Sequence, residues 1–284
     1  MRPFPPVAGV IGWPVAHSKS PLIHRFWLDR LGIDGDYGRF PVEPEQLGKA
    51  IAALPALGLR GVNVTVPHKQ AVIPFLDRLD MRAAAIGAVN TVVVEEAGRL
   101  TGYNSDADGF LEAVLRHKAG RAAGQALVIG AGGAAQAVAH ALAGDGFAVH
   151  VVNRDPARAR ALIRATGGAG DGPDALYDLA RHRRPHPGGS DDALNLLVNT
   201  TTLGMKGAPP LDMVLDDVAS GTLVYDIVYA PLETPLLAEA RRRGLPTVDG
   251  LEMLIGQAAI AFELFYGQPA PRDGDAALRR LLTA

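Results

Sequence analysis

The chain has 284 residues, 48% of them hydrophobic and 20% charged, which is enough for one large domain or two modest ones, each with its own core. Its 28 basic and 30 acidic residues give a net charge of −2, a balance that disfavours nucleic acid as the main partner. It has no cysteine, which excludes disulfides and thiolate chemistry, and no apolar stretch typical of a signal peptide or a membrane span, so we expect a cytoplasmic protein.

Short β-branched segments alternate with longer amphipathic segments along the first part of the chain. This alternation is typical of βα units with a mostly parallel sheet, and therefore of the α/β class. It predicts strands at 7–11, 37–40, 62–66 and 89–94, and helices at 21–31, 44–57, 71–79 and 108–118. The small-residue segment AGRAAG at 119–124 is predicted to be a hinge.

The same alternation continues to the end of the chain. Residues 126–163 predict a strand, a glycine turn, a helix, a strand and a helix. Later elements are predicted at 194–199, 223–227 and 246–248 (strands) and at 251–264 (helix). The stretch 166–192 is rich in Gly, Pro, His and Arg and predicts a short helix at 174–181 between surface loops. Its HRRPH run at 182–186 has no acidic or cysteine partners at ligand spacing, so we interpret it as a solvated loop and expect no metal site.

A glycine-rich GxGxxA turn follows the strand predicted at 126–129. The first glycine of such a turn makes the bend, the second lets the backbone approach a pyrophosphate, and the last small residue lets helix and strand pack closely. The helix N-terminus then faces the phosphates. We therefore predict a dinucleotide site rather than a merely structural bend, with contacts at Gly130, Ala131, Gly132, Gly133 and Ala134.

The end of the next strand, at Asn153, selects the dinucleotide. An acidic residue there favours NAD, because it accepts hydrogen bonds from the free 2′-hydroxyl. Here Arg154 and Arg158 stand one helical turn apart and could clamp a 2′-phosphate, so we expect NADP. Asp155 would repel that phosphate unless its side chain caps the helix that opens at Pro156, which leaves NAD open as the alternative.

Two serines precede a proline-started helix near the N-terminus. Ser18 and Ser20 are two residues apart, just ahead of Pro21. Their hydroxyls could donate to a carboxylate, and the helix dipole would add its field. The alternative is that Ser20 is simply the N-cap of that helix.

Two further polar clusters stand at strand–helix junctions, where open α/β sheets bind their substrates. In the segment NVTVPHK, strand alternation puts Asn63 and Thr65 on one face, and Pro67 turns the chain so that Lys69 projects from a helix start. The other cluster consists of Asn90, Thr91, Asn104, Ser105 and Asp106.

Together these motifs resemble the shikimate dehydrogenase family. The matching patterns are GxPxxHSxSPxxH, NVTxPxK, GAVNT, NSDxxGF, GAGGAA, NRxxxR and DGxxMLxxQAxxAF, and they span nearly the whole chain in the family's order. The resemblance implies the reversible NADPH-dependent reduction of 3-dehydroshikimate to shikimate in the chorismate (aromatic amino-acid) pathway. The implied partner is this small-molecule substrate, with no nucleic acid and no membrane, and a homodimer is left open.

The resemblance also implies the domain organisation. An N-terminal α/β substrate domain (1–106) would be completed by C-terminal helices (249–284). A Rossmann NADP-binding domain (107–248) would be inserted between them, with a cleft between the two domains.

Single residues take roles from the same resemblance. Lys69 and Asp106 match the catalytic pair, and Ser18 and Ser20 match the serines that hold the substrate carboxylate. Gly250 stands where the chain re-enters the substrate domain beside the nicotinamide. The other implied residues are Asn63, Thr65, Asn90 and Gln257 around the ring hydroxyls, Tyr229 at the carboxylate end, and Asn153 at the cofactor.

Two positions depart from the family pattern. Ser105 replaces the more usual threonine and keeps its hydroxyl, whereas Asp155 replaces a small hydroxyl residue and bears on the choice of cofactor.

The reaction needs the catalytic pair because hydride delivery to a ketone leaves an alkoxide that must gain a proton as it forms. An ammonium is a strong donor for this, and a neighbouring carboxylate holds it in place and binds the reacting hydroxyl. The alternative is that Lys69 is a surface charge and Asp106 a helix cap.

Two other functions are left open. One is an NAD-linked quinate/shikimate dehydrogenase with the same architecture, and the other is a non-catalytic regulator that binds NADP or another ligand on this fold. The presence of both Lys69 and Asp106 speaks against the regulator. Methylenetetrahydrofolate dehydrogenases share the general arrangement but would not require the HSxSP segment.

Overall fold

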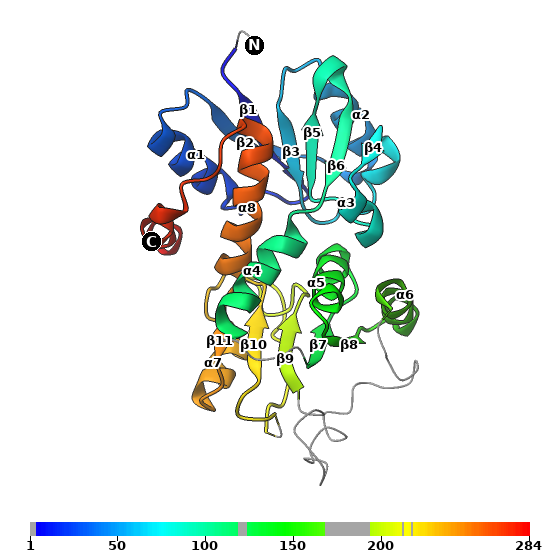
Figure 1. The fold of residues 1–284 in the computed structure, drawn as a ribbon, viewed down its shortest axis with the longest axis vertical. Helices are drawn as coiled ribbons and strands as arrows, with labels where there is room; N and C mark the ends of the chain where they lie inside the picture. The colour runs from blue at the N-terminus through cyan, green and yellow to red at the C-terminus, as the bar shows by residue number, and fades with distance from the viewer. Residues whose placement is uncertain (1–3, 119–123, 168–193, 212, 217) are drawn as a thin grey trace. The chain divides into compact units, whose positions relative to one another are not determined.

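The computed structural model describes residues 4–118, 124–167, 194–211, 213–216 and 218–284. The chain divides into two compact units, Met1–Gly109 with Leu254–Ala284 (unit 1) and Phe110–Met253 (unit 2). Both boundaries fall inside helices, α4 (Asp106–Lys118) and α8 (Gly250–Tyr266), which are labelled in Figure 1. The helix predicted at 174–181, the HRRPH run, and residues 119–123 of the predicted hinge lie outside the described residues.

Unit 1 contains a six-stranded sheet in the order β2-β1-β3-β5-β6-β4. Its strands are β1 (Val7–Gly12), β2 (Asp36–Pro41), β3 (Gly61–Val64), β4 (Arg78–Leu79), β5 (Thr91–Val94) and β6 (Leu100–Tyr103). β1 pairs in parallel with β2 and β3, but β5 is antiparallel to both β3 and β6. The sheet is therefore mixed, because the chain passes between β5 and β6 by a short connection instead of a helical crossover.

Different helices cover the two faces of this sheet. Alternate residues of a strand point to opposite faces, so Ala8 and Val10 of β1 pack with Phe265 of α8, whereas Ile11 packs with Ile51 of α2 (Leu47–Ala53). Figure 1 shows α8, in orange, in front of β1 and β2. The face of the sheet beneath α8 is the one that carries the polar site described below.

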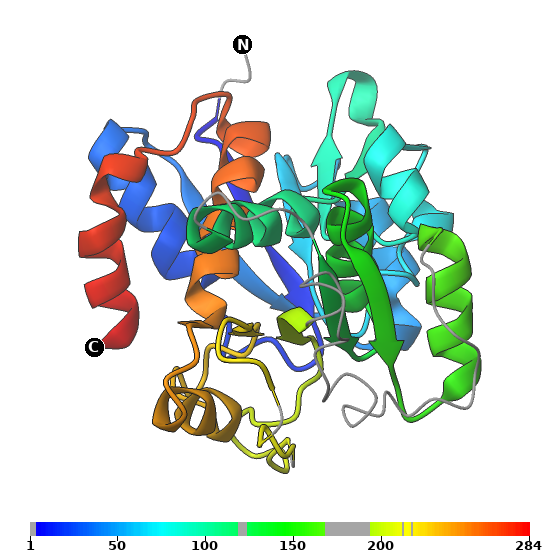
Figure 2. The same ribbon diagram turned by 60° about the horizontal axis from the view of Figure 1, so that its bottom comes forward.

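The C-terminal segment returns to the first helix of unit 1. α1 (Ser20–Leu31) buries Ile23, Trp27 and Leu28 and ends at Gly32 in the left-handed conformation. α9 (Asp275–Thr283) lies beside α1 in both Figure 1 and Figure 2. The Lys19 ammonium, just ahead of α1, donates to a carbonyl in the last turn of α9, so the two ends of the chain are joined by polar contacts as well as by packing.

Unit 2 contains a fully parallel five-stranded sheet in the order β11-β10-β9-β7-β8. Its strands are β7 (Gln125–Ile129), β8 (Ala148–Val152), β9 (Leu194–Asn199), β10 (Leu223–Asp226) and β11 (Thr247–Val248), and its helices include α5 (Gly133–Gly144), α6 (Pro156–Thr166) and α7 (Pro235–Arg242). Leu127 and Ile129 of β7 pack with Leu236 and Leu237 of α7. This doubly wound arrangement confirms the predicted α/β class.

Two predicted helices of unit 1 differ from the structure. The helix at 71–79 is wrong, because this stretch forms a 3-10 turn at Ile73–Phe75 and then β4. Pro74 lies in its middle, and a proline disfavours the helical conformation at the residue before it and removes a donor. The helix at 44–57 is shorter than predicted, with a 3-10 turn at Pro44–Gln46 and then α2 ending at Ala53, shortly before Pro55.

The elements of unit 1 that have no counterpart among the predicted helices and strands include β6 and α3 (Met81–Ile86). β6 forms an antiparallel partner for β5. α3 follows Asp80, whose side chain accepts hydrogen bonds from the backbone N–H groups of Arg82 and Ala83. This N-cap explains why so short a helix forms here.

Candidate active site

The two predicted carboxylate-binding serines lie together at the start of α1. Ser18 and Ser20 are each 6% exposed, and the Ser18 hydroxyl donates to the Ser20 hydroxyl at 3.2 Å. Lys19, not Ser20, is the N-cap residue, and Ser20 is the first residue of the helix. Arg39 of β2 donates from Nε and Nη2 to the Ser18 carbonyl at 2.9 and 2.6 Å, which puts a fixed positive charge next to this pair.

The predicted catalytic pair is a close ion pair. Lys69 Nζ donates to Asp106 Oδ2 at 2.5 Å, and the two side chains are only 15% and 6% exposed. Lys69 does not project from a helix start as predicted. It lies in a turn whose position is fixed by the backbone N–H of Val89, which donates to the Lys69 carbonyl at 2.8 Å. Asp106 opens α4, where the N-terminal end of the helix dipole stabilises a carboxylate.

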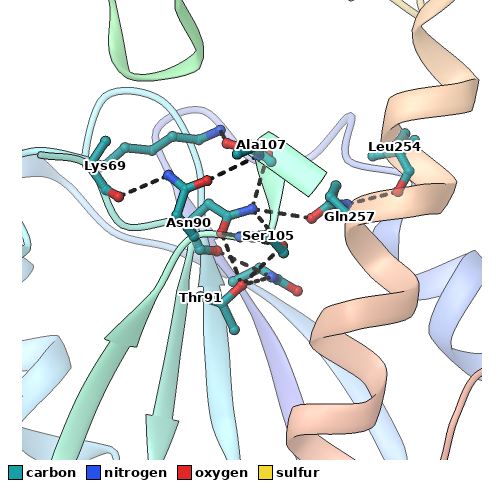
Figure 3. A network of polar contacts seen from close by, with 11 residues as sticks. Lys69, Asn90, Thr91, Ser105, Ala107, Leu254 and Gln257 are labelled. Carbon is teal, nitrogen blue, oxygen red and sulfur yellow. Dashed lines mark hydrogen bonds and ion pairs between the residues drawn. The ribbon is translucent and has the colours of Figure 1, made fainter. Parts of the chain in front are cut away.

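Asn90 joins this ion pair to the neighbouring polar side chains (Figure 3). Its amide nitrogen donates to Asp106 Oδ1 at 3.0 Å and to Ser105 Oγ at 2.9 Å, and lies 3.4 Å from Gln257 Oε1. Its amide oxygen accepts from the backbone N–H of Ser105 at 2.8 Å. Asn90 is 2% exposed, so its orientation is set by the protein on both sides of the amide.

Gln257 reaches this network because α8 passes very close to α4. A Cβ atom built on Gly109 would lie 2.3 Å from the backbone nitrogen of Gln257, so the position has no room for a side chain. The Gln257 amide nitrogen donates back to the Leu254 carbonyl at 2.8 Å. The Gln257 amide oxygen therefore points toward Asn90.

Asn63 lies one strand away, at the end of β3, and connects to the same network. Its amide nitrogen donates to the Asn90 carbonyl at 3.2 Å and to Thr91 Oγ1 at 3.0 Å, and its oxygen accepts from the Tyr37 hydroxyl at 2.6 Å. Thr65 follows β3 and is half-buried. Unit 1 therefore brings together seven of the sequence-predicted residues through direct contacts or one intervening side chain, namely Ser18, Ser20, Asn63, Lys69, Asn90, Asp106 and Gln257.

The glycine turn of unit 2 has the form that a dinucleotide site requires. Gly130 follows β7 with φ of +113°, and a Cβ atom there would lie 2.5 Å from Thr200 Oγ1, so only glycine fits. Beside Gly132 there is open space, with no atom within 4 Å of a Cβ built on it. In the described part of the chain no side chain caps the N-terminus of α5, so its backbone N–H groups remain able to bind phosphate. Gly133 and Ala134 begin that helix, and Ala131 is buried in the turn.

The turn from β8 into α6 carries the residues that would read the ribose. Asp155 is the N-cap of α6, and its carboxylate accepts from the backbone N–H of Ala157 at 2.9 Å. Asn153 donates from its amide to the Asp155 carbonyl at 3.0 Å. Arg154 and Arg158 are both exposed at this turn. The carboxylate is thus engaged with the helix backbone, and the two guanidinium groups face solvent.

A buried polar network that sequence reasoning missed holds the loop after β10. Asp226 is fully buried and accepts from Asn199 Nδ2 at 3.0 Å, from the Val228 backbone at 3.0 Å and from Thr234 Oγ1 at 2.7 Å. Burial raises the pKa of the Asp226 carboxyl, and these hydrogen bonds oppose the rise. The half-buried Tyr229 lies in this loop. Gly250 begins α8 and packs against the same loop, since a Cβ atom built on it would lie 2.3 Å from the Ile227 carbonyl oxygen.

Neither a metal cluster nor a membrane helix is found in the described ranges. No group of three or more His, Cys, Asp or Glu side chains there is arranged to hold a metal ion. No helix among those residues is both long enough and apolar enough to span a bilayer.

Three family profiles match the chain. The profile for the "Shikimate dehydrogenase substrate binding domain" matches residues 10–92, that for "Shikimate / quinate 5-dehydrogenase" matches 114–182, and that for the "Shikimate 5'-dehydrogenase C-terminal domain" matches 250–275. A curated relative, "Shikimate dehydrogenase (NADP(+))" of Rhodospirillum rubrum, is 53% identical over 273 residues that cover 95% of this chain and 94% of that protein.

Solved structures show the same similarity over the whole chain. The shikimate 5-dehydrogenase of Thermus thermophilus in complex with NADP(H) and shikimate is 38% identical, with a TM-score of 0.83, over 98% of this chain and 99% of the other. The quinate dehydrogenase of Corynebacterium glutamicum in complex with NAD is 32% identical, with a TM-score of 0.84, over 98% and 99% of the two chains.

Proposed function

The chain belongs to the shikimate dehydrogenase family, and we propose that it catalyses the reversible reduction of 3-dehydroshikimate to shikimate with NADPH. The relative from Rhodospirillum rubrum carries this name at 53% identity over most of both chains. The single observation in the molecule that best supports the proposal is the Lys69–Asp106 ion pair at 2.5 Å, held within a buried polar network.

The residues of this network would serve proton transfer. When bound, NADPH supplies the hydride that the carbonyl carbon accepts. The Lys69 ammonium would donate the proton that the carbonyl oxygen needs to become a hydroxyl, and in the reverse direction Lys69 would take it back. Asp106 keeps Nζ in place through Oδ2 while Asn90 holds Oδ1, so the donor is oriented before substrate arrives.

The neighbouring polar groups would orient the substrate. Ser18 and Ser20 would bind the carboxylate, with the Arg39 charge beside them. The ring hydroxyls would contact Asn63, Thr65, Asn90 and Gln257, and Tyr229 would act at the carboxylate end. Since several donors and acceptors of this set already bind one another, the site is preorganised for a small polyhydroxylated acid.

The turns of unit 2 would hold NADP. Gly130, Ala131, Gly132, Gly133 and Ala134 would cradle the pyrophosphate at the start of α5, and Gly250 would lie by the nicotinamide. Asn153, Arg154 and Arg158 would bind the adenosine end, with the 2′-phosphate between the two guanidinium groups. The capping bond of Asp155 supports NADP, because it engages the carboxylate with the backbone of α6.

A cytoplasmic location, a homodimeric state and the domain limits 1–106 with 249–284 and 107–248 stay predictions. A small-molecule substrate follows from the family. The near-neutral net charge of the sequence argues against a nucleic-acid partner.

The second candidate is an NAD-linked quinate dehydrogenase, which the similarity to the Corynebacterium glutamicum enzyme favours. Initial rates with shikimate and with quinate, each with NADP and with NAD, separate the two. We expect shikimate with NADP to give the highest kcat/KM, at least roughly tenfold above shikimate with NAD, since two charge-assisted contacts to the 2′-phosphate are lost with NAD. A preference for quinate with NAD would overturn the proposal in favour of this alternative.

A further inference from the structure

Tyr37 of β2 contacts a residue of the proposed substrate site, although none of the sequence motifs includes it. The side chain is fully buried, and its hydroxyl donates to Asn63 Oδ1 at 2.6 Å. Burial raises the pKa of the Tyr37 hydroxyl, and the Ser20 hydroxyl opposes this rise. The phenol therefore binds the asparagine that is proposed to contact a ring hydroxyl.

The hydrogen bond from Tyr37 decides how the Asn63 amide is presented. A phenol hydrogen can bond only to the amide oxygen, which leaves the amide nitrogen for the Asn90 carbonyl and Thr91 Oγ1 at 3.2 and 3.0 Å. Both hydrogens of that nitrogen then have protein acceptors. Asn63 consequently offers an incoming hydroxyl its remaining oxygen lone pair, and so acts as an acceptor in substrate recognition.

The Tyr37 ring is itself held by a stacked histidine. The ring centroids of His24, in α1, and Tyr37 lie 4.0 Å apart, and the angle between the two ring planes is 13°. His24 is completely buried, and neither of its ring nitrogens has a hydrogen-bond partner among the described residues. Burial lowers the pKa of His24 to about 3, so the ring is neutral at ordinary pH and serves as a flat packing surface.

We propose that Tyr37 is a positioning residue, whose hydroxyl orients the Asn63 amide for a ring that carries hydroxyl groups. This rests on the proposed function, because it assigns Asn63 to the substrate. Removal of the hydroxyl frees the Asn63 amide to rotate and weakens substrate binding, while the Lys69–Asp106 pair keeps its own contacts.

The test is Tyr37→Phe, which keeps the ring on His24 and removes only the hydroxyl. We expect KM for shikimate to rise by about tenfold, with kcat within about threefold of the parent, since the lost contact orients bound substrate rather than the reacting atoms. The matched control is Tyr103→Phe, because the Tyr103 hydroxyl also belongs to unit 1 but donates to Glu95 Oε1 at 3.2 Å. The control should leave KM within about twofold.

A double-mutant cycle with Asn63→Ala separates positioning from general loss of stability. If Tyr37 acts through Asn63, adding Tyr37→Phe to Asn63→Ala changes KM by no more than about twofold. The double variant lacks the unpaired amide oxygen that Tyr37→Phe alone would leave. Its KM can therefore be compared with that of Asn63→Ala even where Tyr37→Phe alone folds poorly.

An unchanged KM in Tyr37→Phe, or full additivity of the two KM effects, would overturn the inference. These outcomes are distinct from failure of the proposed function, which would show as a parent enzyme that does not oxidise shikimate with NADP. Direct titration of shikimate into each folded variant gives the same comparison without turnover.

Discussion

Asn90 is the residue at which the proposed substrate-binding groups and the proposed proton-transfer pair meet. Its amide contacts Asp106, Ser105 and Gln257 within 3.4 Å, while its backbone carbonyl accepts from Asn63. A change at any of these groups is therefore passed to Asp106, and through it to Lys69. Ser18 and Ser20 lie outside these direct contacts, so their loss should affect binding without altering the proton donor.

At this scale we predict that Ser18→Ala and Ser20→Ala each raise KM for shikimate by about tenfold and leave kcat nearly unchanged, because the carboxylate is bound equally in ground and transition states. Steady-state kinetics with saturating NADP measures this. Thr283→Ala is the control, since its hydroxyl bonds only to carbonyls of its own helix α9. A fall in kcat at unchanged KM would contradict the assigned role of the serines.

At the scale of elements, we propose that the turn between β8 and α6 selects the cofactor. The helix needs an acceptor at its N-terminus, and Asp155 supplies it to the backbone N–H of Ala157. The same carboxylate would oppose a 2′-phosphate if it faced it, but a repulsion of about 1 kcal/mol across solvent is smaller than the gain from two charge-assisted hydrogen bonds, at about 1.5–3 kcal/mol each.

We therefore expect Arg154→Ala to remove most of the preference for NADP, by lowering kcat/KM with NADP about tenfold and leaving that with NAD within about twofold. Arg164→Ala is the matched control, because it lies in the last turn of the same helix. Equal losses with both dinucleotides would mean that Arg154 contacts a part that they share.

The sequence motifs pointed to polar residues that the structure brings together, whereas some of the helices and strands that carry them were predicted wrongly. Seven of the proposed site residues meet in unit 1 because their motifs stand at strand and helix ends, and the ends of neighbouring strands meet at one edge of the sheet. The helix predicted at 71–79 does not form, because Pro74 interrupts a segment whose apolar residues otherwise have helical spacing. Tyr37 was missed because its contact with Asn63 depends on β2 and β3 both pairing with β1, and no local pattern records that pairing.

At the scale of the molecule, the stability of unit 1 should depend on pH through His24. Both tryptophans of the chain, Trp13 and Trp27, belong to unit 1. The rings of Trp27 and His24 meet edge-on, with their centroids 6.1 Å apart. Tryptophan fluorescence therefore reports the unfolding of unit 1 selectively. The folded unit keeps His24 neutral down to a pKa of about 3, whereas an unfolded histidine accepts its proton near pH 6.5.

The contribution of neutral, buried His24 to the stability of unit 1 is fully present above about pH 6.5. It is lost as the pH falls toward the pKa of His24 in the folded unit. Between about pH 7 and pH 5.5, the free energy of unfolding of the parent should fall by about 1 kcal/mol more than that of His24→Phe. Urea unfolding followed by tryptophan fluorescence measures both. Equal pH dependence in the two proteins would show that His24 does not stay neutral when buried.

The most direct test of the whole account measures shikimate oxidation with NADP by the parent and by Lys69→Ala, with shikimate binding measured separately by calorimetry. The parent should reduce NADP with shikimate, and kcat of the variant should fall by about 10²–10⁴-fold, the usual consequence of losing a positioned acid–base group. Its Kd for shikimate should stay within a few-fold of the parent value. A parent without this activity, or a variant that keeps kcat within a few-fold of the parent, would contradict the account.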